Sequence, residues 1–254
     1  MDVYDWSAYS DAELTAFAEV TVRLARDLRR EAPSPRGAPR FGLDMSFADP
    51  LLLDRFSRHG IFRKYQRAVA LGSGLGGVQR WWAVHFGCSV LSVDPHPGVV
   101  AAAQILGART GLGDRVSFRQ GPLDALPLKP EQFTHAWSVE GLTGLGDPTP
   151  LLAEAMRVLR PAGLLTVVLP FDEPTLAQWS AATAATGFLP ALVKPLQPPE
   201  LPYTVYYAEH CLRAVLELQP DPERRARLLE IAAHLSAARA SRAARVLLFA
   251  ERPS

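Results

Sequence analysis

The sequence has few cysteines, no long apolar run and almost no net charge, and each shortage excludes a class of protein. Cys88 and Cys211 are the only cysteines and neither belongs to a C-x-x-C pair, which argues against a disulfide framework and a zinc knuckle, so we expect no metal. No apolar run reaches the roughly 18 residues of a membrane span, and the start, MDVYDWSAYSDAEL, is acidic where a secretory signal is basic. The net charge of +1 gives no electrostatic reason to expect a nucleic acid or a membrane as partner. Together these shortages predict a cytoplasmic protein with neither kind of partner.

What the 254 residues do contain is the composition of a folded α/β domain. Apolar residues make up 48% and charged residues 21%, proportions that argue against wholesale disorder. From about residue 67, short apolar runs alternate with helical patterns, which is typical of a parallel sheet covered by helices on both faces. The expected strands span residues 67–72, 88–94, 115–121, 134–140, 164–170, 189–197 and 244–251, and the expected helices among them span 78–87, 97–110, 148–160 and 173–187. The pattern predicts a Rossmann-like, doubly wound, mostly parallel seven-stranded sheet.

Helical appendages flank this pattern. Residues 1–60 read as an N-terminal helical cap, because Ser10 and Glu13 form a capping-box pattern before a helical stretch. Residues 61–254 form the main domain, in which lid helices over about 203–242 precede the last strand. Asp221 and the following proline suit the start of the second lid helix, and its arginines are most simply a solvated face.

A glycine-rich turn, VALGSGLGG over residues 69–77, directly follows the first expected strand. Glycines let the backbone approach a ligand closely, and the helix that follows aims free N–H groups at it. Asp94 ends the second strand, 18 residues beyond Gly76, where a carboxylate can accept both hydroxyls of an adenosine ribose. The loop reads as G-x-G-x-x-G through Gly77 and as G-x-G-x-G through Gly76. The residues therefore predict an adenosine-containing cofactor and leave a nicotinamide dinucleotide and S-adenosylmethionine both open.

Downstream segments resemble the class I S-adenosylmethionine-dependent methyltransferases that modify small molecules, strongly over about 60–170 and in outline beyond. VLSVDP resembles their ribose-binding strand end, and FTHAWSVEGLTGLGD their fourth strand and active-site loop. LLAEAMRVLRPAGLLTVV is very like the helix, turn and fifth strand that these enzymes share, and a nicotinamide domain has no need of it. The resemblance implies S-adenosylmethionine as cofactor and a small-molecule acceptor, with no recognition module for nucleic acid, and it is compatible with a homodimer.

The resemblance also implies a set of cofactor-binding residues: Gly72, Ser73, Gly74, Gly76, Asp94, Pro95, Leu123, Ser138 and Val139. The glycines would pack under the methionine part of the cofactor, and Asp94 would hold the ribose. Pro95 and the backbone N–H of Leu123 would meet the adenine. Ser138 and Val139 would run beneath the sulfonium.

Other positions depart from the family pattern. Ala70 stands where an acid helps to anchor the ammonium group, and Pro122 replaces an aspartate that commonly accepts the adenine amino group. Thr134 replaces an aspartate before the fourth strand, and Gly144 stands where many relatives place a histidine base. Two lost charge-assisted hydrogen bonds would weaken cofactor binding by on the order of a hundredfold. A second interpretation is therefore a methyltransferase-like protein that has lost methyl transfer and binds a ligand or a partner, or catalyses another reaction such as a cyclisation.

Few residues are candidates for a catalytic base. Glu140 lies on the expected active-site loop, and His210 belongs to the first lid helix, so both are candidate catalytic residues. His135, at the start of the fourth strand, is more simply a solvent-facing or core-edge residue. A thiol, an unprotonated amine or an enolate carbon needs little help from a base, so the missing histidine favours an acceptor of that kind.

Overall fold

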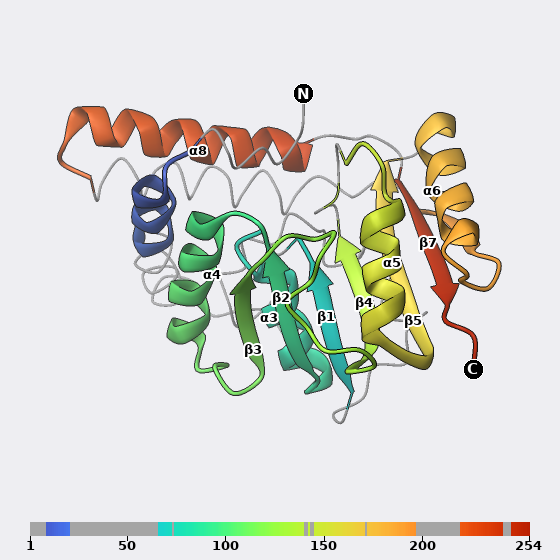
Figure 1. Ribbon diagram of the computed structural model, residues 1–254. Helices are drawn as coiled ribbons and strands as arrows, with labels where there is room; N and C mark the ends of the chain where they lie inside the picture. The colour runs from blue at the N-terminus through green and yellow to red at the C-terminus, as the bar shows by residue number, and fades with distance from the viewer. Residues whose placement is uncertain are drawn as a thin grey trace.

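The computed structural model describes residues 9–20, 66–72, 74–139, 142, 145–170, 172–196, 219–240 and 245–254. They contain a seven-stranded sheet in the order β3-β2-β1-β4-β5-β7-β6 (Figure 1). The strands are β1 (Arg67–Leu71), β2 (Ser89–Asp94), β3 (Val116–Gln120), β4 (Phe133–Val139), β5 (Leu159–Pro170), β6 (Leu192–Leu196) and β7 (Arg245–Glu251). Strands β1 to β5 pair in parallel, whereas β7 is antiparallel to β5 and β6. The predicted Rossmann-like, mostly parallel sheet is confirmed.

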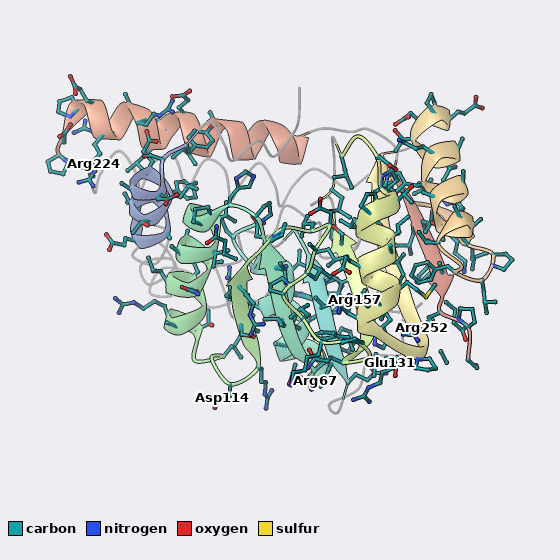
Figure 2. All side chains as sticks on the ribbon, viewed as in Figure 1. Arg67, Asp114, Glu131, Arg157, Arg224 and Arg252 are labelled. Carbon is teal, nitrogen blue, oxygen red and sulfur yellow. The ribbon has the colours of Figure 1, made fainter. Side chains whose placement is uncertain are left out.

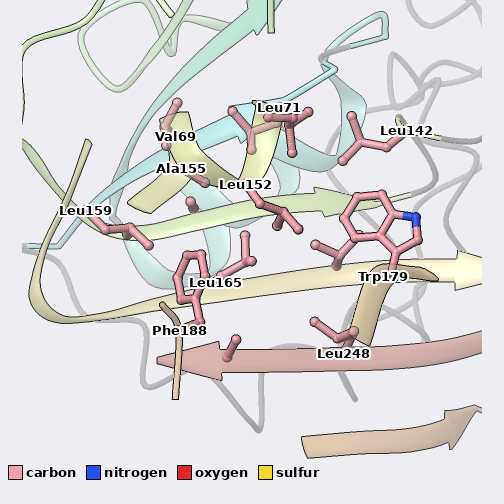
Figure 3. Close-up of a cluster of buried hydrophobic side chains, with 14 of the residues drawn as sticks. Val69, Leu71, Leu142, Leu152, Ala155, Leu159, Leu165, Trp179, Phe188 and Leu248 are labelled. Atoms are coloured by element: carbon pink, nitrogen blue, oxygen red, sulfur yellow. The ribbon is translucent and has the colours of Figure 1, made fainter. Parts of the chain in front are cut away.

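Helices cover both faces of the sheet, and β1 shows how the sequence divides between them. The helices are α3 (Gly77–Phe86), α4 (Pro97–Thr110), α5 (Thr149–Val158), α6 (Glu173–Ala185) and α8 (Pro222–Ala240). Successive strand residues point to opposite faces, so Ala70 packs in the cluster that contains Trp82 of α3. Val69 packs on the other face, in the cluster that contains Leu152 of α5 and Trp179 of α6 (Figure 3). The continuous apolar runs of these strands are explained by burial on both sides.

The helices begin and end at the residues that favour such ends. Gly87 follows α3 in the left-handed conformation, with φ of 66°, and Pro97 occupies the first turn of α4. Asp221 accepts hydrogen bonds from the backbone N–H groups of Glu223 (2.9 Å) and Arg224 (3.0 Å), so it caps α8 as expected.

The expected boundary of the fifth strand is wrong by five residues, because β5 begins at Leu159 and includes the segment read as a turn. Ala162 adopts φ of 57° there, and its N–H donates to the carbonyl of Arg252 at 3.1 Å. The pairing of β4 with β5 shifts between Phe133 and His135. The Arg-Pro-Ala-Gly stretch is therefore an irregularity within a longer strand, and a residue from the end of the chain satisfies its backbone.

Of two further helical pieces, α8 lies across the carboxyl ends of the strands and the other lies at the side of the sheet next to α4 (Figure 1). A segment over 11–20 begins with a capping box in which Glu13 accepts from Ser10 N (2.7 Å) and Ser10 Oγ (2.8 Å). Figure 1 shows α8 across that edge of the sheet, with this segment (blue) close to its first turns. The proposed domain division at residue 60 stays a prediction. None of the helices within the described ranges is long and apolar enough to span a membrane.

Candidate functional site

The glycine loop connects β1 to α3 at the carboxyl end of the sheet, beside the point where the strand order reverses between β1 and β4. Gly72, Gly74 and Gly76 have φ of 74°, 47° and 79°, a region that only glycine adopts without strain. A Cβ on Gly74 would meet no described atom within 4 Å, whereas one on Gly76 would collide with the Phe118 ring. The loop therefore has a side packed against β3 and, among the described residues, an open side at Gly74 that suits a ligand.

Beneath this loop lies an arginine that the sequence analysis did not single out. Arg80 of α3 is wholly buried, and its Nη1 donates to the carbonyl of Leu75 at 2.7 Å. The same nitrogen lies 2.9 Å from the place that a Cβ on Gly76 would take. Arg80 therefore holds the closed side of the loop, and the sequence contains no motif that identifies it.

Asp94 binds the loop from the end of β2. Its Oδ2 accepts from Gly74 N at 3.3 Å and its Oδ1 accepts from His96 N at 3.0 Å. Asp94 is only 3% exposed. A backbone hydrogen bond from Gly72 N to Val93 O, 3.0 Å long, also holds the loop against β2. Each oxygen of a carboxylate accepts more than one hydrogen bond, so this arrangement is compatible with the hydroxyls of a ribose. The structure thus brings together Asp94, the glycines and Pro95, which follows on the exposed side of the strand end.

The segment after β3, which carries Leu123, is attached to α5 by hydrogen bonds from its backbone to Glu154 and Arg157, which form an ion pair within that helix. Glu154 accepts from Leu126 N at 2.7 Å and from Arg157, whose Nη2 lies 2.6 Å from its Oε2. Arg157 also donates to the carbonyls of Leu126 (3.1 Å) and Leu128 (2.8 Å). The hydrogen bonds from Arg157 lower the pKa of Glu154. Glu154 and Arg157 thus fix the segment after β3 on α5, and their spacing of three on a helix is the signal in LLAEAMRVLR that points to them.

Replacing Arg157 with alanine is expected to lower the free energy of unfolding by about 2 kcal/mol at pH 7, because the carbonyls and the Glu154 carboxylate lose a charged donor. Since the pair lowers the pKa of Glu154, that part of the stabilisation is complete above the unfolded pKa of about 4.3 and is lost as the pH falls through the folded pKa. Urea denaturation should show that the difference in the free energy of unfolding between Arg157→Ala and the parent protein is smaller at pH 3 than at pH 7. The exposed Arg160, replaced by alanine, is the control, and an equal loss there, or a gap equally wide at pH 3, would contradict the assignment.

The end of β4 supplies the fourth side of the site. Ser138 is 1% exposed, and its Oγ has no hydrogen-bond partner among the residues that the structure describes. Val139 follows it, half-buried, as the last residue of β4. A buried hydroxyl with unmet hydrogen-bonding capacity beside the glycine loop is what a bound polar ligand would satisfy.

Two residues near the other end of β4 are structural. His135 is 3% exposed, which excludes the solvent-facing alternative and leaves a position in the core, and burial lowers its pKa to about 4. Its imidazole is therefore neutral at pH 7, and its Nδ1 lies 2.9 Å from Thr134 Oγ1. Thr134 donates to the carbonyl of Arg67 (2.9 Å) and accepts from Arg67 N (3.2 Å). Thr134, in place of the family's aspartate, thus supports the pairing of β1 with β4 at the end of the sheet opposite the carboxyl ends of the strands.

Ala70 lies in apolar surroundings that would not accommodate the acid of the family pattern. It lies in register with Trp137 of β4, is 1% exposed, and belongs to one cluster with Trp82 and Trp137. The centroids of these two indole rings are 3.9 Å apart, with planes inclined by 38°. A carboxylate at position 70 would be buried against indole rings, so the ammonium anchor of the family pattern does not fit here.

The remaining predicted residues are not brought together by the described structure. Ser73, Glu140, Gly144, His210 and the first lid helix, at about 203–218, lie outside the described residues. Glu140 and His210 therefore stay predictions as catalytic residues. Pro122 is described and exposed, and the nearby Asp124 is exposed as well.

Comparisons with known proteins agree with this geometry. Residues 69–167 match a family model described as a methyltransferase domain. The tocopherol O-methyltransferase of Arabidopsis thaliana is 27% identical over 139 residues, which cover 51% of this chain and 40% of that protein. The malonyl-[acyl-carrier protein] O-methyltransferase of Enterobacter lignolyticus is 30% identical over 122 residues, which cover 47% of this chain and 46% of that protein. This chain thus spans less than half the length of these relatives.

Solved structures show the fold. The [4+2]-cyclase SpnF has a TM-score of 0.63 at 19% identity, over 94% of each chain. Phosphoethanolamine N-methyltransferase 2 of Haemonchus contortus, in complex with S-adenosylhomocysteine, has a TM-score of 0.58 at 18% identity, over 100% of this chain and 60% of that one. At such identities the likeness confirms the architecture of the sheet and its covering helices.

Proposed function

Because residues 69–167 form a class I S-adenosylmethionine-dependent methyltransferase domain, we propose that this chain transfers a methyl group from S-adenosylmethionine to a small-molecule acceptor. The observation that carries the proposal is Asp94 at the carboxyl end of β2, whose Oδ2 accepts from Gly74 N in the glycine loop while its Oδ1 accepts from His96 N at the start of α4. The two relatives are named as methyltransferases of tocopherol and of malonyl-[acyl-carrier protein]. They support methyl transfer as the reaction, although their acceptors differ.

The residues present fit one end of the cofactor and not the other. The open side of Gly74, the Asp94 carboxylate and the buried Ser138 hydroxyl suit the ribose and the part that leads to the sulfur. Ala70 in its indole cluster supplies no carboxylate for the ammonium group. The bound cofactor would supply an electrophilic methyl group on a sulfonium. This chain's residues would align the acceptor with that group and exclude water. These two effects supply most of the catalysis of such a displacement.

We place the acceptor among intrinsically good nucleophiles: a thiol, an unprotonated amine or an enolate carbon. The support is Gly144 in place of the usual histidine, together with the burial of the neutral His135 within the sheet. Glu140 or His210 would serve as base if a hydroxyl is the acceptor. A cytoplasmic setting is supported by the buried free thiol of Cys88, and the net charge of +1 favours a small acceptor over nucleic acid. A homodimer stays a prediction.

Calorimetry with S-adenosylhomocysteine and S-adenosylmethionine tests the proposal, and we expect micromolar dissociation constants. Mass spectrometry of acceptor mixtures incubated with methyl-labelled cofactor would then identify the product class. Absence of heat with both ligands, together with an unchanged melting temperature, would overturn the proposal. Binding without methyl transfer to any nucleophile would favour the second interpretation, a protein that uses the fold for ligand binding or another reaction such as a cyclisation, to which the environment of Ala70 gives its support.

A further inference from the structure

One arginine of α8 joins two parts of the chain that lie far apart in sequence. Arg227 Nε donates to Glu13 Oε1 at 2.6 Å, across 214 residues of chain. The Arg227 guanidinium carbon also lies 5.2 Å from the centroid of the Tyr9 ring, within the range of a cation–π contact. The Arg227 side chain is 37% exposed and that of Glu13 is 27% exposed, so the pair is half-buried. Arg227 is therefore an exception to the solvated face that the sequence suggests for this helix.

Glu13 is a fixed partner rather than a mobile surface acid. Its Oε2 closes the capping box with Ser10, while its Oε1 receives Arg227. The hydrogen bonds from Ser10, and then that from Arg227, lower the pKa of Glu13 to about 2. One carboxylate thus starts the N-terminal helical segment and joins it to α8.

The N-terminal segment is in turn fitted onto α4 next to the cofactor loop. A Cβ on Gly98 would come within 2.8 Å of the Asp11 backbone, so glycine is needed for the two helices to approach this closely. Gly98 follows Asp94 by four residues, in the first turn of the helix that the strand end leads into. Leu14 and Phe17 of the segment are each 1% exposed. A continuous series of contacts therefore runs from the Asp94 strand end through the segment to α8.

We propose that Arg227 is a positioning residue that holds α8, through Glu13 and Tyr9, over the adenosine end of the site. The proposal rests on the function proposed above for that site. Release of the cofactor then requires displacement of elements that the Arg227 contact holds together, so breaking the contact speeds release. Because the pair is half-exposed, salt screens it, and release should accelerate with ionic strength.

Other arginines of α8 provide matched controls. Arg224, on the same helix, is exposed (Figure 2), and its backbone N–H donates to Asp221 Oδ1 at 3.0 Å. Arg225 donates from Nε to the carbonyl of Gln219, which lies just before the start of the same helix. Arg224→Gln therefore removes a charge from α8 without touching the N-terminal segment.

Hydrogen–deuterium exchange on the ligand-free chain is the first arm of the test. Arg227→Gln and Glu13→Gln should each raise exchange about two- to fivefold in both 11–20 and the first turns of α8, whereas Arg224→Gln should not. Gly98→Ala, which dislodges the segment by packing, should loosen α8 as well. Faster exchange confined to the mutated element, or no response of α8 to Gly98→Ala, overturns the proposal.

Stopped-flow dissociation of S-adenosylhomocysteine is the second arm. Arg227→Gln and Glu13→Gln should each speed release about two- to fivefold, and the double variant by less than the product of the two, because both remove the Arg227–Glu13 hydrogen bond. The contacts of Arg227 with Tyr9 and Glu230 and of Glu13 with Ser10 are separate. Additive effects, or release from the Arg227 variant at the parent rate, overturn the proposal. If the parent chain binds no S-adenosylhomocysteine, the proposed function fails while the exchange arm still judges the contact.

Discussion

Asp94→Ala should weaken the binding of S-adenosylhomocysteine about a hundredfold or more, as measured by calorimetry at pH 7. The carboxylate accepts from the backbone N–H groups of Gly74 and His96, so its removal loosens the loop and the start of α4 together. It also removes the acceptor that a ribose hydroxyl would use. The loss therefore combines a charged hydrogen bond to the ligand with the preorganisation of the loop.

Two further variants sharpen this result. Asp94→Asn keeps the shape and one carbonyl oxygen but no charge, so we expect an intermediate loss of about tenfold. Asp114→Ala removes an exposed acid from the turn before β3 and should leave binding unchanged (Figure 2). Parent-like affinity in Asp94→Ala would mean that the ligand does not use this strand end, and with it the proposed function would fall.

Ala70→Asp should lower the melting temperature by about 10 °C, since burial of a carboxyl group against apolar surroundings costs about 3–5 kcal/mol. The new group would lie beside Trp82 and Trp137, whose rings fill that face of β1. Desolvation would raise its pKa in the folded protein above the unfolded value, so the destabilisation should grow as the pH rises above about 4.

Ala70→Asn is the matched control for charge. It should destabilise the protein to a smaller extent and without dependence on pH between 4 and 8, because it carries no titratable group. A stable Ala70→Asp variant that binds S-adenosylhomocysteine more tightly would show that the family's ammonium anchor can be restored. It would contradict the conclusion that the indole cluster excludes an acid.

The sequence was sufficient for features that depend on local chemistry. The glycine-rich turn after β1, the capping box at Ser10 and the strand-end position of Asp94 follow from residue types at fixed spacing. The alternation of apolar runs with helices was likewise sufficient for the sheet, because parallel strands must be buried on both faces.

Features that depend on distant contacts were not accessible in this way. The early start of β5 depends on pairing with Arg252, about 90 residues later, and no local signal marks it. The meaning of Ala70 depends on Trp137, which lies beside it only after β1 pairs with β4. The same holds for Arg227, whose partner Glu13 lies at the other end of the chain. A single sequence shows residue types, whereas these roles are set by which chain segments meet.

The position of β7 has a consequence for how the protein is made. It lies between β5 and β6, and both of those earlier strands need it to complete their pairing. Arg252, just beyond it, donates to the carbonyls of Met156 and Leu159 and pairs with Glu131. On the ribosome, β6 therefore has no neighbour and β5 keeps an open edge until residue 252 has emerged from the exit tunnel. A nascent chain stalled before that point would expose an unpaired apolar strand edge, a substrate for chaperones and a template for aggregation.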